Sequence, residues 1–361
     1  MRHRCNRRVL LAAALGVPLI RAGAIIGKGL PEPSTAGPET PALSGTLLQL
    51  SAEHLRWTHA DWTRLFDDFE RLHISRIVIQ WVVSDGTSFY APMPDVTKPP
   101  LLEILGAAET MPLQVLVGLI FDPNYWDRIA GSPDSTAAYL ADREARSIRV
   151  VNELLPIVEP YRCFKGWYLC EEIDDTNWRD PAPSAILHSY LHRISDYLKL
   201  VSPGTLIAIS GFSSTRTAPA ELQQLWEGVL HAAPAINVLI FQDGIGAHKL
   251  ALADLSLYLA AVLAATKSTR CALWSVTELF EQTAAVPPDT GAFHAVPAPF
   301  SRVIDQLRTE SAFASELIAF TAPDYMLSQS NPAAATLLDA YLQYIDTGSG
   351  SRSRPRISKG P

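Results

Sequence analysis

Residues 166–173 read GWYLCEEI, an apolar run rich in aromatic residues that ends in two glutamates. A short apolar run of this kind, bounded by charged residues, predicts a buried β-strand. Residues 273–281, LWSVTELFE, repeat the pattern and also present a glutamate where the apolar run ends. We therefore expect two strands that each carry a carboxylate at the C-terminal end.

Short β-rich runs alternate with longer helical patterns from about residue 44 to residue 347. Eight strand candidates occur in this region, and each is followed by a helical stretch. The predicted strands cover residues 46–50, 76–81, 114–119, 164–169, 205–210, 237–242, 271–276 and 316–320. Strands that alternate with helices in this way are expected to lie parallel and to be joined by right-handed crossovers.

The helical stretches carry apolar residues at helical spacing. In residues 60–72 an apolar stripe runs from Trp62 to Leu72, and Asp61 places a negative charge in the first turn. Further helices are expected at residues 102–108, 135–158, 250–265, 303–313 and 333–344. Eight strand–helix units of this length predict an α/β fold with a single (β/α)8 TIM barrel. The alternative, an open doubly wound sheet, would gather ligand-binding residues at one switch point, whereas distinctive residues follow nearly every strand here.

The N-terminus has the features of a secretory signal peptide. Residues 1–8 contain four arginines and no acidic residue, residues 9–20 are apolar, and Ala22-Gly23-Ala24 offers a cleavage site. The apolar run is too short to span a bilayer, so we expect no transmembrane anchor in the mature protein. Arg7 and Arg8 fit a twin-arginine signal, and the general secretory route is the alternative. The sequence therefore predicts a periplasmic or secreted bacterial protein.

Four segments are expected: the signal peptide at 1–24, a proline-rich linker at 25–43, the barrel at 44–347 and a disordered basic tail at 348–361. Cleavage after Ala24 removes five arginines and no acidic residue, so the formal charge moves from −7 to −12. A chain this acidic is not expected to bind nucleic acid.

The cysteines that remain after removal of residues 1–24, and the histidines, do not have the spacing of a metal site or of a disulfide framework. Cys163, Cys170 and Cys271 are an odd number without metal-binding spacing, so packing in the core is expected, with at most one bridge. His188 and His192 stand four residues apart but lack the glutamate of a zinc-protease motif. No phosphate-binding glycine loop or dinucleotide fingerprint occurs either, and we expect neither a metal nor a cofactor.

Polar and aromatic residues follow most of the predicted strands, where the active site of a barrel is built. The candidate site residues are Gln80, Trp81, Asp122, Tyr125, Trp126, Tyr168, Glu171 or Glu172, Trp178, Gln242, Asp243, Glu278 and Tyr325. Aromatic faces that stack on sugar rings, together with amides and carboxylates that bind hydroxyl groups, suit a carbohydrate ligand. Trp62, Trp167 and Trp226 are expected to fill the layer between helices and barrel, and the role of Trp274, inside a strand, is left open.

Successive side chains of a strand face opposite sides, so only one of Glu171 and Glu172 can face the barrel mouth. If Gly166 faces inward, Tyr168, Cys170 and Glu172 share its side. The pattern therefore favours Glu172, and a break of register at the strand's end would favour Glu171 instead.

The chain resembles domain-of-unknown-function family 4434, a bacterial family of glycosidase-like TIM barrels, over most of residues 45–328. The resemblance rests on GTLLQL, IQW, VLVGLIFDPNYW, GWYLCEEID, FQDGIG and LWSVTELFE, which occur in the family's order. It places the strand-four glutamate at Glu172 and the strand-seven glutamate at Glu278. By similarity to the wider glycosidase clan, Glu172 would be the acid/base and Glu278 the nucleophile. Two departures are that Glu171 stands where that clan has Asn, and that SGFSS after the fifth strand lacks a proline.

The leading hypothesis is an exported glycoside hydrolase that uses Glu172 and Glu278, with a retaining mechanism and an oligosaccharide or polysaccharide as substrate. The first alternative is a non-catalytic carbohydrate-binding barrel of an envelope or exopolysaccharide system. Another is a barrel hydrolase or lyase that acts on a different small molecule. In the simplest alternative the two glutamates only form ion pairs with residues of the surrounding helices.

Overall fold

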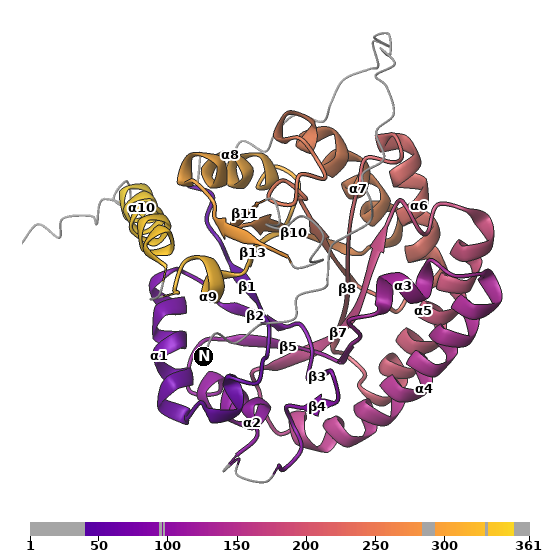
Figure 1. Cartoon of the computed structure of the whole chain (residues 1–361), viewed down its shortest axis with the longest axis horizontal. Coiled ribbons are helices and arrows are strands. Elements are labelled where there is room, and N and C mark those ends of the chain that lie inside the picture. Colours follow the sequence, from indigo (N-terminus) through magenta and orange to yellow (C-terminus); the bar gives the residue numbers. More distant parts are fainter. Residues whose placement is uncertain (1–39, 94–95, 97, 284–292, 329–330, 350–361) are drawn as a thin grey trace, which may run out of the picture.

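The computed structural model describes residues 40–93, 96, 98–283, 293–328 and 331–349. The predicted signal peptide, most of the linker and the tail from residue 350 lie outside the described residues. Eight strands form a closed barrel in the order β1-β13-β10-β9-β8-β7-β5-β2, and every neighbouring pair is parallel. Helices surround the barrel (Figure 1). The predicted (β/α)8 fold is therefore confirmed.

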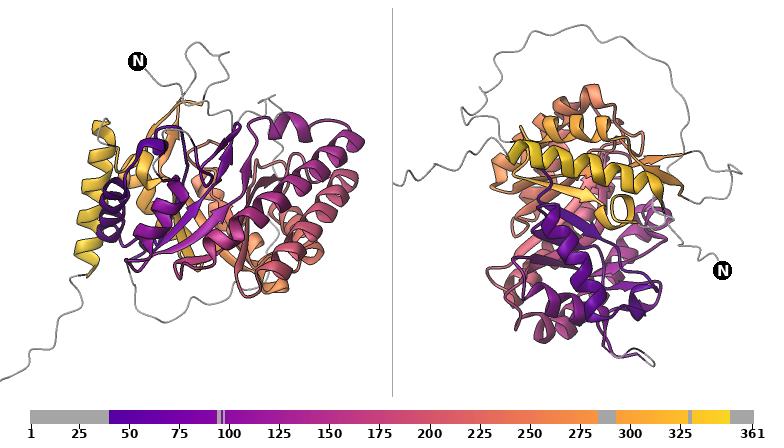
Figure 2. Two further views of the ribbon diagram at one scale, coloured as in Figure 1. Left: turned by 90° about the horizontal axis from the view of Figure 1, so that it is seen from below. Right: turned by 90° about the vertical axis from the view of Figure 1, so that its left-hand side faces the viewer.

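All eight predicted strands are present, with boundaries shifted by a few residues. The barrel strands are β1 (Gly45–Leu48), β2 (Arg76–Ile79), β5 (Gln114–Gly118), β7 (Phe164–Asp174), β8 (Leu206–Phe212), β9 (Val238–Gln242), β10 (Ala272–Glu278) and β13 (Glu316–Phe320). The outer helices are α1 (His59–Arg71), α2 (Pro100–Ala108), α4 (Pro133–Val158), α5 (Pro181–Val201), α6 (Pro219–Ala232), α7 (Leu255–Thr269), α8 (Phe300–Glu310) and α10 (Pro332–Ser349). The last of them, α10, lies between α8 and α1 and completes the ring (Figures 1 and 2).

Short elements that the sequence did not predict occur between the barrel strands and the outer helices. They are η1 (His54–Arg56), β3 (Val83–Ser84), β4 (Thr87–Ser88), β6 (Ile120–Phe121), α3 (Tyr125–Ile129), η2 (Leu252–Asp254), β11 (Phe280–Gln282), β12 (Ala295–Pro297) and α9 (Ala322–Tyr325). β3, β4 and β6 form one small sheet, and β11 pairs with β12 in another. Elements of two to five residues are too short to show a hydrophobic period, which explains why pattern analysis missed them.

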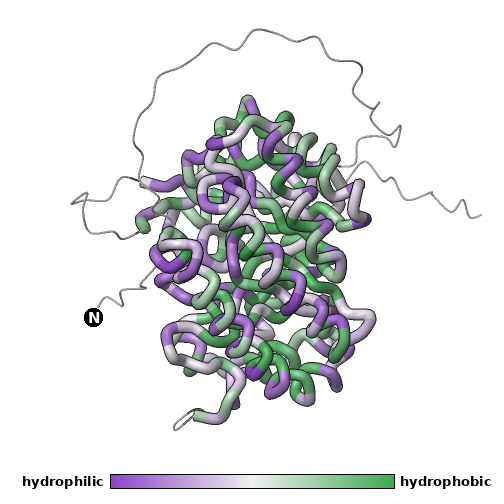
Figure 3. Tube along the Cα trace, turned by 90° about the vertical axis from the view of Figure 1, so that its right-hand side faces the viewer, coloured by the Kyte–Doolittle hydropathy of each residue, from purple (hydrophilic) through white to green (hydrophobic). Residues whose placement is uncertain are grey.

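Helix α1 shows how local sequence sets the outer ring. The Thr58 side chain accepts the backbone N–H of Asp61, and the Asp61 carboxylate accepts the backbone N–H of Thr58, which forms a capping box. The apolar stripe that begins at Trp62 is buried against the barrel. Hydrophilic and hydrophobic residues alternate along the outer helices in the same manner on the side drawn in Figure 3.

Two separate cores fill the molecule. The interior of the barrel is packed by inward-facing strand residues such as Val78, Leu116, Tyr168 and Trp274, which is 4 % exposed. A larger core lies between strands and helices and contains Trp62, Trp167 and Trp226, as expected from the sequence. Trp274 is thus a packing residue of the barrel interior.

Gly166 allows β7 and β8 to approach closely. Its φ angle is 157°, and a Cβ atom at this position would lie 2.1 Å from the carbonyl oxygen of Leu206. A side chain here would push the two strands apart.

Among the described residues, no helix is long and apolar enough to cross a membrane.

Candidate functional site

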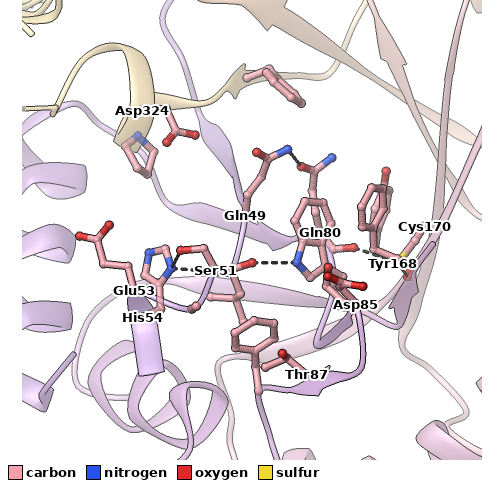
Figure 4. A pocket seen from close by; sticks show the side chains of 18 of the residues that line it. Gln49, Ser51, Glu53, His54, Gln80, Asp85, Thr87, Tyr168, Cys170 and Asp324 are labelled. Carbon is pink, nitrogen blue, oxygen red and sulfur yellow. Dashed lines mark hydrogen bonds between the residues drawn. The ribbon is translucent and has the colours of Figure 1, made fainter. Parts of the chain in front are cut away.

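A cavity of about 1390 Å³ opens at the C-terminal ends of the barrel strands. Glu172, near the end of β7, and Glu278, at the end of β10, both border it. Figure 4 shows the part of the cavity that lies over β1 and β2. Sites for drug-sized ligands measure about 300–1,000 Å³, so this cavity has room for a larger molecule.

A bulge in β7 decides which of the two adjacent glutamates faces the cavity. Leu169 pairs with Ile209 of β8, but the next pairing joins Glu172 to Ser210, so two residues of β7 are inserted between them. An insertion of two residues preserves the alternation of side chains. Glu172 therefore stays on the inner side with Tyr168, as the period of two favoured, even though the register does break.

Glu172 is held by two neighbours and is 8 % exposed. Gln242 Nε2 of β9 donates a hydrogen bond of 2.7 Å to Glu172 Oε1, and the Tyr125 hydroxyl donates one of 2.9 Å to the Glu172 carbonyl oxygen. Burial raises the pKa of Glu172, and the hydrogen bond from Gln242 opposes the rise. The side chain is thus fixed in direction and favours its protonated form more than a glutamate in water.

Glu171 borders the cavity but is paired behind its wall. Arg143 of α4 donates to Glu171 Oε1 from Nη2 at 2.6 Å and from Nε at 3.0 Å, and it also donates to the Ile120 carbonyl oxygen at 2.6 Å. The Arg143 and Glu171 side chains are only 2 % and 3 % exposed. This buried ion pair holds Oε1 of Glu171 toward α4, so the arrangement favours Glu172 as the strand-four carboxylate that faces the cavity.

Glu278 lies under the loop that follows β9. The backbone N–H of Ala247 donates to Glu278 Oε2 at 2.8 Å. Gly246 makes this contact possible, because a Cβ atom there would lie 2.1 Å from the Phe280 carbonyl oxygen and 3.1 Å from the Glu278 side chain. Burial raises the pKa of Glu278 to about 8, and the charge of Asp243 adds to the rise. Glu278 therefore differs from Glu172 in its neighbours but shares a desolvated position.

Lys249, which the sequence analysis did not select, is a cation beside both carboxyl groups. Its ammonium lies 3.1 Å from the centre of the Phe212 ring at the end of β8. Burial lowers the pKa of Lys249 to about 8, while the charges of Glu172, Glu278 and Asp174 raise it. The positive charge in turn lowers the pKa of each of the two glutamates.

Seven of the ten predicted substrate-binding residues border the cavity: Gln80, Trp81, Asp122, Tyr125, Trp126, Tyr168 and Gln242. The Trp81 ring stacks on Phe121 with ring centres 4.6 Å apart, and its Nε1 donates to the Leu50 carbonyl oxygen. Asp122 accepts a hydrogen bond of 3.0 Å from the Tyr139 hydroxyl. The Tyr168 hydroxyl lies 2.6 Å from Ser210 Oγ on the floor of the mouth.

The other three predicted residues lie away from the cavity wall. Trp178 is 1 % exposed and lies in the core between strands and helices. The turn after β7, in which the Asn177 backbone N–H donates to Asp174, directs the chain toward the helix layer ahead of Trp178. Asp243 faces outward because it follows the inward-facing Gln242, and Gln306 of α8 donates to its carboxylate. Tyr325 packs against Phe280 with ring centres 5.4 Å apart.

Several cavity residues carried no signal that the sequence analysis recognised. Gln49 follows β1 and donates from Nε2 to Gln80 Oε1 at 2.6 Å. His54 and Trp57 come from the short helix η1 and the residue after it. The rule that barrel sites lie where strands end could have found Gln49, since it immediately follows the strand end at Leu48.

The described residues contain no group of three or more His, Cys, Asp or Glu side chains arranged to hold a metal ion. Cys163, Cys170 and Cys271 are free thiols. Cys170 borders the cavity and its Sγ donates to the Gln80 carbonyl oxygen at 2.9 Å.

The sequence of the chain is similar to a known protein family and to a bacterial protein. Residues 43–336 match the protein family described as "Domain of unknown function (DUF4434)". The chain is 27 % identical over 282 residues to the uncharacterized protein YbcH of Escherichia coli (strain K12), which covers 78 % of this chain and 89 % of that protein.

Solved structures with a similar fold include two that are named as enzymes of carbohydrate chemistry. A putative alpha-L-fucosidase from Bacteroides thetaiotaomicron VPI-5482 superposes with a TM-score of 0.68 at 19 % identity, covering 91 % of this chain and 99 % of that one. A GH18 chitinase from Pseudoalteromonas aurantia superposes with a TM-score of 0.52 at 10 % identity, covering 84 % and 100 %. At these identities the likeness shows a glycosidase-like barrel fold.

The Arg143–Glu171 pair gives a test of the architecture of the site. Arg143→Met leaves a buried carboxylate without its partner, so we expect the free energy of unfolding to fall by about 3–5 kcal/mol. The double variant Arg143→Met/Glu171→Gln should recover part of this loss. Urea denaturation followed by tryptophan fluorescence measures both changes. The control is Arg193→Met, which breaks the surface pair with Glu144 and should cost less than about 1 kcal/mol. Equal losses for Arg143→Met and Arg193→Met would contradict this account.

Proposed function

The chain belongs to the family described as "Domain of unknown function (DUF4434)", and from this membership and its paired glutamates we propose that it is an exported glycoside hydrolase. One observation carries the proposal: Glu172 and Glu278, from two different strands, border one cavity at the mouth of a glycosidase-like barrel. Hydrolysis of a glycosidic bond requires two carboxyl groups in different environments. The different neighbours of Glu172 and Glu278 support that requirement.

The mechanism we propose is retaining. A Glu278 carboxylate oxygen attacks the anomeric carbon while Glu172 gives its proton to the departing glycosidic oxygen. Water, deprotonated by Glu172, then displaces Glu278 from the anomeric carbon and returns both carboxyl groups to their starting states. The hydrogen bond from Gln242 holds Glu172 in place, and the Ala247 N–H holds Glu278.

Burial raises the pKa of both glutamates, and the hydrogen bonds and charges around each of them oppose that rise. Glu172 must hold a proton until the bond breaks, and burial favours that protonated form. Glu278 must be ionised to attack, and both the Ala247 N–H and Lys249 favour its carboxylate against the effect of burial. Lys249 is thus proposed as the residue that balances the charge of the nucleophile.

Aromatic side chains support a carbohydrate as the substrate. Trp81 and Trp126 border the cavity and are partly exposed. Trp81 is backed by Phe121, and Trp126 by Tyr125 at 5.0 Å, so each indole ring is fixed in place. Fixed aromatic faces stack on the C–H faces of sugar rings at little cost in side-chain entropy.

Amide substitution of each glutamate tests the proposal. Glu278→Gln keeps the shape but removes the attacking charge, and Glu172→Gln removes the acid, so each should lower turnover by several orders of magnitude while glycan binding persists. The assay follows product release from a panel of aryl glycosides and polysaccharides. The control is Glu316→Gln, which changes a glutamate at the opposite end of the barrel that pairs with Arg76.

The outcome separates the enzyme from the alternatives. Activity of Glu278→Gln or Glu172→Gln close to that of the wild type would refute the catalytic roles. A wild-type protein that binds glycans but cleaves none in the panel would be a carbohydrate-binding barrel. If it neither binds nor cleaves any glycan, the carbohydrate proposal is wrong.

The pH dependence of kcat/KM should reflect the buried position of the pair. Because the pKa of each glutamate is raised, we expect the optimum well above 4.5, the ordinary carboxyl value. The rate should rise with pH as one carboxyl group of the pair ionises and fall as the other loses its proton, and both limbs belong to the coupled pair. Lys249→Met removes a charge that favours the ionised forms and should move the rising limb to higher pH, whereas Lys267→Met on the surface of α7 should not. An optimum near pH 4.5 would contradict this prediction.

Export remains part of the proposal on the basis of residues 1–24 alone. Mass spectrometry of the protein recovered from the periplasm or medium should find an N-terminus near Ile25. A protein that retains residues 1–24 there would contradict it.

A further inference from the structure

Among the described residues, the walls of the cavity extend from the glutamate pair toward β1 and β2 and not toward β8. Most of its described lining residues belong to β7, to the ends of β1, β2, β5, β10 and β13 and the segments that follow them, and to η1 and α1. Apart from Gln242, none comes from residues 173–277. On that side the Lys249 ammonium lies over the Phe212 ring at the end of β8. Glu172 and Glu278 therefore stand at one end of a long cavity.

The far end of the cavity is formed by η1 and the residue after it. The Trp57 ring is partly exposed, borders the cavity and packs at 4.7 Å against both His54 and the buried Trp62. An indole held from behind in this way keeps a fixed orientation. It can therefore serve as a stacking surface for a sugar ring.

His54 adds a hydrogen-bond donor beside Trp57. The backbone N–H of Ser51 donates to His54 Nδ1 at 3.0 Å, so this nitrogen is the acceptor. Burial lowers the pKa of His54, which favours the neutral ring, and the proton of that ring is then on Nε2. A neutral ring with a donor at Nε2 suits the oxygen of a sugar hydroxyl group.

Polar and aromatic side chains continue from the glutamates to this far end. Gln49 donates to Gln80 Oε1, so the Gln49 Oε1 atom stays available as an acceptor. Figure 4 shows this pair of amides. Trp81 follows Gln80 in the chain, borders the cavity and provides a second aromatic face. The wall thus alternates stacking surfaces with hydrogen-bonding groups along its length.

We propose that this part of the cavity, from the glutamate pair to Trp57, binds several consecutive sugar units that all lie on one side of the cleaved bond. The Trp57 indole and the His54 Nε2–H form the distal subsite. The enzyme then cleaves near one end of a glycan chain and obtains its binding energy from the units on the other side of the cut. This inference rests on the proposed function.

The charges of the wall narrow the class of glycan. Nine carboxylate side chains border the cavity, against three guanidinium groups. Arg64 and Arg143 are paired with Asp61 and Glu171, which leaves seven acidic side chains against Arg56. A wall of this charge repels a polyanionic glycan, so the bound units are uncharged or basic.

Oligosaccharide ladders test the proposal. We would measure kcat/KM and the position of the cut for cello-, xylo-, galacto-, chito- and chitosan-oligosaccharides of two to six units, with oligogalacturonides as the anionic set. For the wild type, kcat/KM should rise with each unit added on one side of the cut, the cut should fall near one end, and oligogalacturonides should not be cleaved. Trp57→Ala should lower kcat/KM about tenfold for the longest substrate and leave the shortest unchanged.

Two further variants guard against a folding defect. Trp57→Phe keeps an aromatic face and should recover part of the loss, while His54→Gln should also act only on the longer oligosaccharides. The control is Tyr161→Ala, which removes a partly exposed aromatic residue between α4 and β7 that does not border the cavity. The proposal is overturned if Trp57→Ala lowers kcat/KM at every substrate length or at none. It is also overturned if the wild type cuts in the middle of the glycan chain or cleaves oligogalacturonides.

Binding measurements keep this inference separate from the catalytic proposal. If the wild type cleaves none of the oligosaccharides, titration calorimetry with the same compounds tests whether the distal subsite exists. Weaker binding of six units, but not of two, by Trp57→Ala would support the subsite although the catalytic proposal had failed. No binding by the wild type, or equal binding by wild type and Trp57→Ala, would refute the subsite.

Discussion

The buried ion pair between Arg143 and Glu171 fixes the end of β7, and the candidate site depends on it. Arg143 ties this strand to α4 and, through the Ile120 carbonyl oxygen, to the small sheet beside the mouth. Because the two inserted residues of β7 preserve the alternation of side chains, pairing Glu171 with the helix layer directs Glu172 to Gln242. A residue next to the candidate acid thus positions it without facing the cavity fully.

The mouth of the barrel concentrates acidic groups that water cannot reach freely. Glu172, Glu278 and Asp174 all have raised pKa values, and in each case burial is the main cause. The positive charge of Lys249 opposes the rise in all three pKa values, and the pKa of Lys249 itself is lowered by burial. Groups whose ionisation is shifted in this way gather at functional sites, because there the charged and neutral forms must both be within reach near neutral pH. The environment of the pair, more than its identity, supports the proposed chemistry.

Much of the fold was predictable because strand and helix periods are local properties of the sequence. The eight strands and the inward direction of Glu172 followed from apolar runs and the period of two, and seven of ten proposed binding residues lie on the cavity wall. Trp178, Asp243 and Tyr325 were misplaced since the turn after β7, the outward side of β9 and the short helix α9 are set by tertiary contacts. Lys249 and Trp57 were not predicted because each lies several residues after the strand it follows, in a loop or turn whose path the sequence pattern does not define.

The measurement that tests the central claim most directly is covalent trapping of the nucleophile. Wild-type protein would be incubated with 2-deoxy-2-fluoroglycosyl fluorides of glucose, galactose, mannose, xylose and fucose configuration, digested, and analysed by peptide mass spectrometry. A retaining mechanism with the proposed roles predicts one sugar label per chain, attached to Glu278, and no label on the Glu278→Gln variant. A label on Glu172 or on any other residue would contradict the account.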